Sequence, residues 1–76
     1  METVVVKFSD AQGSEIDCGV NIDGQSSGRT FQKLMVQTGH HAFTLDTATA
    51  HTPGSVERLV QYTAPDDPDI VEFTAT

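Results

Sequence analysis

Histidine, cysteine and aspartate are the residues of this chain whose types could bind a metal or do catalysis. The sequence has 76 residues, with three His and one Cys. His40 and His41 are adjacent, and neighbours on an extended strand point to opposite faces, so the pair is poorly placed to chelate one ion. A site would need His51 as well, and structural zinc usually takes four well-spaced Cys or His ligands. The sequence therefore predicts no metal site. It predicts His41 as a half-buried strand residue that is hydrogen-bonded through one ring nitrogen.

Two further groups could do chemistry, and the sequence favours a structural interpretation of both. Asp66, Asp67 and Asp69 could hold Ca²⁺ loosely, but the regular carboxylate spacing, glycine and later Glu of a calcium loop are missing. We therefore interpret them as part of a solvated acidic turn. Cys18 could form a nucleophile–base pair with a histidine. However, it lies on the apolar side of its segment, where a free cysteine packs as a small hydrophobic residue.

No catalytic motif accompanies these residues. A nucleophile elbow, a phosphate loop and a paired-carboxylate motif are all missing from the sequence. We therefore expect no enzyme activity, and the sequence predicts no catalytic, cofactor-binding or metal-binding residue.

The elements that position these side chains are predicted to be short strands, because apolar residues alternate with polar ones between turns rich in Gly, Ser, Asp and Pro. Strands are predicted at residues 3–8, 18–23, 29–36, 40–45 and 69–75. The side chains expected to point inward are those of Val4, Val6, Phe8, Cys18, Val20, Ile22, Phe31, Leu34, Val36, His41, Phe43, Leu45, Val71, Phe73 and Ala75.

Several connections are also predicted. Residues 10–13 and 64–68 indicate turns, residues 25–28 a loop or the edge of a hairpin, and residues 47–55 a loop. The segments 29–36 and 40–45 are expected to form an antiparallel hairpin through the reversal at 37–39. Residues 56–63 fit either a helix capped by Ser55 or a strand with Val56, Val60 and Tyr62 on one face. The neighbouring strands favour a strand.

These segments predict an all-β fold, a small antiparallel two-layer β-sandwich of six to seven strands of the prealbumin or immunoglobulin kind. Residues 1–76 are expected to form a single domain, since this length suits one modest core. Cys18 is the only cysteine, so no disulfide within the chain can support the core.

The charge is strongly acidic and unevenly spread. The formal net charge is −7, and residues 39–76 contain Arg58 as their one basic residue among six acidic ones. Phosphate backbones and anionic membranes attract Lys and Arg, so we expect no nucleic-acid binding. The apolar run at residues 4–6 is too short for a signal peptide or a membrane span. The chain is expected to be cytoplasmic or an excised domain of a longer protein, and the sequence leaves both open.

Residues 20–45 resemble the PEGA family of small β-sandwich domains. Residues 20–24 (Val-Asn-Ile-Asp-Gly) are similar to its V-x-V-D-G strand and turn, and residues 28–30 (Gly-Arg-Thr) to its G-x-T. Leu34 and Val36 occupy its alternating aliphatic positions. Residues 39–45 resemble its G-x-H-x-V-x-V strand, with His41 on the His position. Phe31 replaces the usual Pro, and residues 37–38 (Gln-Thr) replace a Pro-rich approach to the glycine. The resemblance implies a non-catalytic module with a binding or spacer role.

Exposed strand edges are the feature of the predicted fold through which we expect the protein to bind a partner. A small open sandwich has edge strands that can pair with a partner or with a second copy. Lys7 and Lys33 are the only lysines, so protection of the edges by lysine is thin. We expect a non-catalytic β-sandwich module for protein interaction or a structural role. The alternative is a carbohydrate-type ligand module, which would need Tyr62 and Phe31 exposed together.

Overall fold

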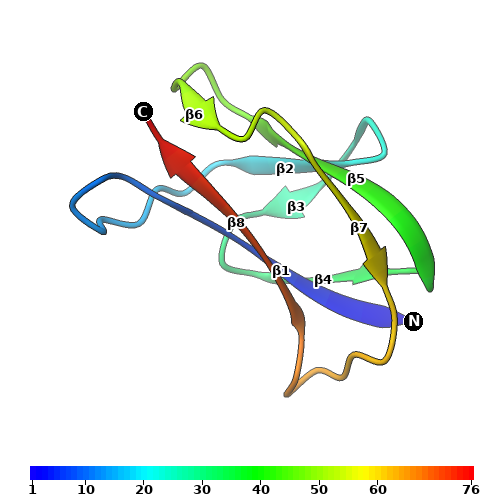
Figure 1. The fold of residues 1–76 in the computed structure, drawn as a ribbon. Coiled ribbons are helices and arrows are strands. Elements are labelled where there is room, and N and C mark those ends of the chain that lie inside the picture. The colour runs from blue at the N-terminus through cyan, green and yellow to red at the C-terminus, as the bar shows by residue number, and fades with distance from the viewer.

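Two four-stranded sheets form the protein in the computed structural model, which describes all 76 residues (Figure 1). No helix is present. The strands are β1 (Glu2–Ser9), β2 (Gly19–Ile22), β3 (Gln25–Arg29), β4 (Lys33–Val36), β5 (Gly39–Asp46), β6 (His51–Thr52), β7 (Val56–Val60) and β8 (Asp69–Ala75). The all-β prediction is confirmed, with eight strands where six or seven were expected.

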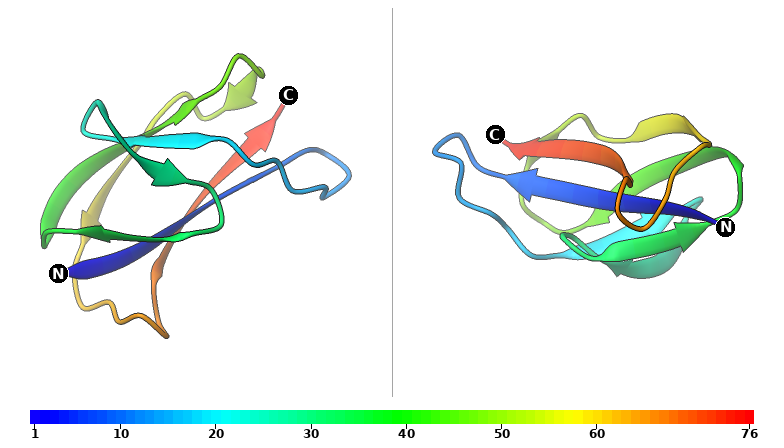
Figure 2. Two further views of the ribbon diagram at one scale, coloured as in Figure 1. Left: turned by 180° about the vertical axis from the view of Figure 1, so that it is seen from behind. Right: turned by 90° about the horizontal axis from the view of Figure 1, so that it is seen from below.

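One sheet has the strand order β4-β1-β8-β6 and the other β3-β2-β5-β7. Every strand pair is antiparallel except β1 with β8, which run in parallel from Val4 opposite Asp69 to Ser9 opposite Thr74. Figure 2 shows these first and last strands side by side, pointing the same way. The two-layer sandwich is therefore mostly antiparallel around one parallel central pair.

The core follows the two-residue alternation of the sequence. Successive strand residues point to opposite faces, so every second side chain enters the space between the sheets. The buried apolar residues are the predicted inward residues Val4, Val6, Phe8, Cys18, Val20, Ile22, Leu34, Val36, Phe43, Leu45, Val71 and Phe73, together with Val60 from the strand alternative for residues 56–63. The segment at 56–63 is a strand from Val56 to Val60, which confirms the preferred interpretation.

The predicted hairpin between residues 29–36 and 40–45 is wrong. β4 pairs with β1, whereas β5 pairs with β2 and β7, so the two segments lie in opposite sheets. Residues 37–38 and Gly39, which has a φ of +139°, carry the chain across the sandwich. Both strands are apolar on one side because each points alternate side chains into the core from its own sheet, and alternation alone cannot distinguish this arrangement from pairing in one sheet.

Two residues expected inward lie where a strand is interrupted. Phe31 is half-buried with a φ of +62°, and Tyr62 is 90% exposed with a φ of +61°. Phe31 follows Thr30, whose hydroxyl accepts the Cys18 N–H and donates to the Ile16 carbonyl. These bonds turn the chain from β3 in one sheet to β4 in the other. The strand predicted at 29–36 therefore divides, and β6 adds a short strand inside the predicted loop at 47–55.

Hydrogen bonds from polar side chains connect separate segments at the edges of the sandwich. Arg58 on β7 donates to Asp69 Oδ1 at 2.8 Å and to the Ile70 carbonyl at 3.3 Å, which joins the two sheets. Glu2 on β1 accepts hydrogen bonds from the hydroxyls of Thr38 and Thr63 and from the Thr63 N–H. These bonds hold the pKa of Glu2 at about 2, well below its usual value.

Gly28 should be sensitive to substitution, because its backbone lies against the core. It has a φ of +148°, and an added Cβ would stand 2.5 Å from Cδ2 of the buried Leu34. We expect Gly28→Ala to lower the free energy of unfolding by about 1–3 kcal/mol through strain and overpacking. Chemical denaturation measures the change. Gly54→Ala, where the added Cβ meets nothing within 4 Å, is the control; equal stability of the two variants would contradict the close approach.

Candidate functional site

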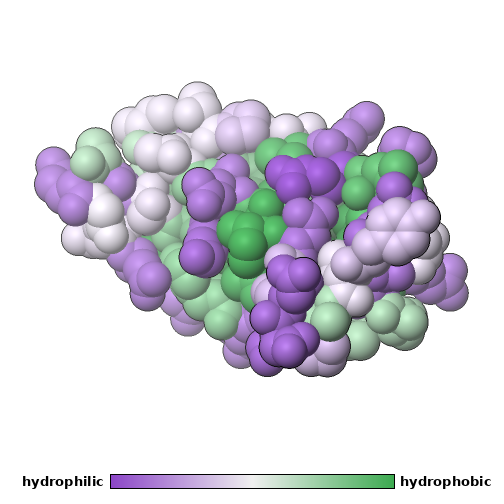
Figure 3. All heavy atoms as spheres, turned by 60° about the horizontal axis from the view of Figure 1, so that its bottom comes forward, coloured by the Kyte–Doolittle hydropathy of each residue, from purple (hydrophilic) through white to green (hydrophobic).

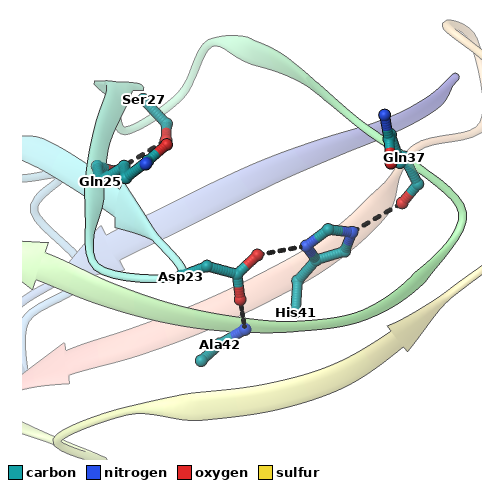
Figure 4. A network of polar contacts seen from close by, with 6 residues as sticks. All are labelled: Asp23, Gln25, Ser27, Gln37, His41 and Ala42. Atoms are coloured by element: carbon teal, nitrogen blue, oxygen red, sulfur yellow. Dashed lines mark hydrogen bonds and ion pairs between the residues drawn. The ribbon is translucent and has the colours of Figure 1, made fainter.

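The best-defined polar site joins the turn after β2 to the crossing between β4 and β5 (Figure 4). His41 Nδ1 lies 2.6 Å from Asp23 Oδ2, and its Nε2 lies 2.7 Å from the Gln37 carbonyl oxygen. The other Asp23 oxygen accepts the Ala42 N–H at 2.9 Å, and the Asp23 N–H donates to the Ala42 carbonyl at 2.8 Å. Asp23 has a φ of +53° at the tight turn with Gly24, which aims its carboxylate back over β5.

This geometry favours a doubly protonated His41. A carbonyl oxygen and an ionised carboxylate only accept hydrogen bonds, so both ring nitrogens can be satisfied only when both carry a proton. In its protonated form His41 bridges two loops. The sequence predicted a half-buried histidine that is hydrogen-bonded through one ring nitrogen. The half-burial is confirmed. The structure adds a second hydrogen bond, from the other ring nitrogen to the Gln37 carbonyl.

The hydrogen bonds shift both titrations in the direction that favours the ion pair. The bond to Asp23, followed by the bond to the Gln37 carbonyl, raises the pKa of His41 above its ordinary value. The Ala42 N–H, followed by His41, lowers the pKa of Asp23. Each group therefore stabilises the charged form of the other.

In this protonated form both ring nitrogens of His41 are occupied by hydrogen bonds, so neither has a lone pair for a metal or for proton abstraction. His40 is exposed on the opposite face of β5, as the strand alternation predicted. An open depression of about 230 Å³ lies beside the site, lined by Asp23, His40, His41, Ala42 and Glu57. It is open to solvent, Ala42 is the only apolar residue of its lining, and its walls come from the β2–β3 turn, β5 and β7.

His51 belongs to a different part of the molecule. Its ring packs edge-on against Phe8 at 5.6 Å and Phe73 at 5.8 Å between ring centroids. Its Nδ1 bonds the Thr49 carbonyl at 2.7 Å. The structure therefore does not bring His51 to His40 and His41, and no three His, Cys, Asp or Glu side chains converge as metal ligands.

The remaining candidates have structural surroundings. Asp66 and Asp67 are exposed in a turn closed by two backbone hydrogen bonds between Ala64 and Asp67, whereas Asp69 is paired with Arg58. Cys18 is buried, and burial raises the pKa of its thiol. A buried thiol with a raised pKa carries little nucleophilic thiolate near neutral pH.

The two aromatic residues of the carbohydrate alternative lie apart. Phe31 donates its N–H to the Val6 carbonyl and lines a second depression of about 160 Å³ beside Lys7 and Ser9. Tyr62 precedes Thr63, which bonds Glu2 at the first residue of β1, and it lines neither depression. The two rings therefore form no common stacking surface.

No family model, curated protein or solved structure matches this chain. The structure contains no helix of the length and apolar character needed to cross a membrane. The fold and its polar side chains define the class of the protein, a small two-sheet β-sandwich. Sequence reasoning missed Asp23 and Gln37 as partners of His41, although the Asp-Gly pair at 23–24 did mark the turn that positions the carboxylate.

The ion pair predicts a bell-shaped dependence of stability on pH. Because the pKa of His41 is raised in the folded state, its contribution to the free energy of unfolding is complete below the unfolded pKa of about 6.5. This contribution is lost as pH rises through the folded pKa. A lowered pKa means that the contribution of Asp23 is present above about 4 and is lost as pH falls. The melting temperature should therefore drop from about pH 6 to about pH 9.

Two variants isolate this effect. His41→Gln should melt lower than wild type at about pH 6 and should lose most of the decline towards about pH 9. His40→Gln, which changes the exposed neighbour, should keep the decline. The groups around His41 are Asp23, His40, Glu57 and the inward Arg58 opposite it in the β5–β7 register. An unchanged decline in His41→Gln would contradict the assignment of the pH dependence to His41.

Proposed function

We propose that this chain is a non-catalytic module that binds another protein by pairing a partner strand with the free edge of β7. Support comes from the hydrogen bonds of β7. Its five residues pair with β5 on one side. No hydrogen bond outside the sheets involves their backbone groups. An unpaired strand edge is a ready template for an added strand.

The antiparallel ladder identifies the free groups. The N–H and C=O of Ala42 both bond Asp23, on the β2 side of β5. Ala42 therefore makes no bond to its opposite residue in β7, Glu57, because bonded and non-bonded pairs alternate in an antiparallel ladder. By the same alternation Leu59, opposite His40, is also unbonded. The backbone groups of Glu57 and Leu59 thus point away from the sheet and are free to pair.

The other three edges suit pairing less well. β3 is polar, contains Gly28 and faces an irregularity of register between Val20 and Asn21, and such irregularities disrupt further pairing. β4 has four residues and begins with Lys33, and lysine in particular protects edges. β6 has only two residues. β7 is regular, contains neither Gly nor Pro, and is the edge strand of the second sheet next to β5.

The surface also favours recognition through the backbone. In the view of Figure 3, hydrophobic atoms surface in small areas separated by hydrophilic side chains. The large exposed apolar residues are Met1, Met35, Leu59 and Tyr62, and none of them lines either depression of the surface. A docking partner would therefore gain more from main-chain hydrogen bonds along an edge than from an apolar face. The PEGA resemblance at residues 20–45, with its implied binding or spacer role, agrees with this proposal.

Leu59→Pro tests the edge, because proline removes a single N–H that points away from β5. The ladder to β5 uses Val56, Arg58 and Val60 and stays intact, and proline is tolerated where the missing N–H faces solvent. Ten-residue extended peptides would be selected against the wild-type protein from a displayed library. We expect Leu59→Pro to weaken their binding at least about tenfold, since a hydrogen bond is lost and the ring obstructs the added strand.

Leu59→Ala is the matched control, because it removes the same side chain but keeps the N–H. It should weaken binding by less than Leu59→Pro, and both variants should show the circular dichroism of the folded protein. Amide exchange of Glu57 and Leu59 should be fast in the free protein and slow in the complex. Peptides that bind Leu59→Pro as well as Leu59→Ala, or a complex in which these two amides stay unprotected, would refute the proposal.

A further inference from the structure

We propose that the partner strand carries a Lys or Arg opposite Glu57 and an apolar residue opposite Leu59, in the sequence order apolar-x-basic. This inference rests on the proposed function, because it names the chemistry of the strand that the β7 edge would accept. Three observations carry it: the position of the two side chains, the charge around β7, and the depression next to Glu57.

Glu57 and Leu59 present side chain and backbone to the same incoming strand. Both side chains are exposed on the outer face of the second sheet, Leu59 to 44%. Both residues also hold the free backbone groups of the edge. Residues directly opposite each other across a ladder have their Cβ atoms about 5 Å apart, so an added strand would place one side chain beside each. An acidic and an apolar neighbour two residues apart select a basic and an apolar partner at the same spacing.

The chain around β7 is rich in acidic residues, and no basic side chain pairs with Glu57. Arg58 is the only Lys or Arg among residues 39–76, and it is already bonded to Asp69 and to the Ile70 carbonyl, whereas His41 is paired with Asp23. The Arg58 side chain points to the inner side of the strand, away from Glu57. Arg29 lies on β3, at the opposite edge of the same sheet, and is paired with Asp17. Glu57 has no ion-pair partner in the chain, since the ion pairs are those of Arg29, His41 and Arg58.

The depression beside Glu57 leaves room for a long basic side chain. Its lining includes Asp23 and Glu57 on either side of Ala42. A Lys or Arg side chain has a long apolar stem with a charged head, so it can cover Ala42 while the head stays near a carboxylate. An acidic side chain at the same place would meet the unpaired carboxylate of Glu57, and this like charge disfavours it.

A second copy of this chain fits the edge poorly. Each copy carries a net charge of −7, so two copies repel. Antiparallel pairing of two β7 strands about Arg58 would also set each Glu57 opposite a Leu59, with no opposite charge. A strand from a different protein with basic character removes both conflicts. Antiparallel pairing is the more stable arrangement, and in that direction the residue opposite Leu59 comes first, which gives the order apolar-x-basic.

Three peptides that differ at one position test the inference. Their central residues are Val-Thr-Arg, Val-Thr-Gln and Val-Thr-Glu, with the third residue intended to lie opposite Glu57. At low ionic strength we expect wild type to bind the Arg peptide about 2–5-fold more tightly than the Gln peptide, and the Glu peptide least. The preference should shrink as salt is raised to about 0.5 M. Isothermal titration or fluorescence anisotropy gives the dissociation constants.

Charge variants assign the preference to Glu57. Glu57→Gln should abolish the preference for Arg over Gln, and Glu57→Arg should reverse it in favour of the Glu peptide. Glu72→Gln is the matched control, because it makes the same change in net charge from β8 of the other sheet. It should keep the preference. A loss of preference equally large in Glu72→Gln would mean that only the overall charge acts, and would overturn the inference.

The outcomes also separate this inference from the proposed function. If all three peptides bind alike and Leu59→Pro weakens all of them, strand pairing at β7 stands and the apolar-x-basic rule is wrong. If Leu59→Pro leaves every peptide unaffected, pairing at β7 is itself refuted and the inference falls with it. Binding of the Arg peptide alone, sensitive to both Leu59→Pro and Glu57→Gln, supports both.

Discussion

The interior between the two sheets is the feature on which every other part of this protein depends. Phe8, Phe43 and Phe73 enter it from β1, β5 and β8 and are almost completely buried. The chain has no disulfide and no helix, so burial of these rings and of the aliphatic side chains around them must supply most of the folding free energy. The arrangement of the edges, the turn at Asp23 and the position of β7 all follow from filling this one space.

The sequence predicted the content of the core well, because a strand alternates with a fixed period of two. Each buried apolar residue could be named in advance, and the exceptions have a local cause. Phe31 and Tyr62 have positive φ values, and the alternation breaks wherever the chain leaves the extended region. Pairing was harder to predict. β4 and β5 are separated by only two residues and yet lie in different sheets, because the choice of neighbour depends on β1, β2 and β7, which are distant in sequence.

The polar site was predictable only in part, for a related reason. Strand alternation placed His41 on the inner side of β5 and His40 on the outer side. The partners of His41 come from loops whose geometry is set by tertiary contacts, the carboxylate at Asp23 and a main-chain carbonyl at Gln37. A carbonyl group is present at every residue, so no sequence pattern marks the one that a histidine will use. The free edge of β7 likewise depends on which strands close the sheet, which periodicity does not specify.

The parallel pairing of β1 with β8 has a mechanical consequence. The two strands are the first and last of the chain, run in the same direction and are in register over six residue pairs. Figure 1 places the N-terminus and the C-terminus at opposite ends of this pair. Tension applied between the two termini would therefore pull the strands along their length in opposite directions. The hydrogen bonds between them would be loaded together in shear, and they could not open one after another like a zipper. The fold is built to resist stretching along this axis far better than peeling from its edges.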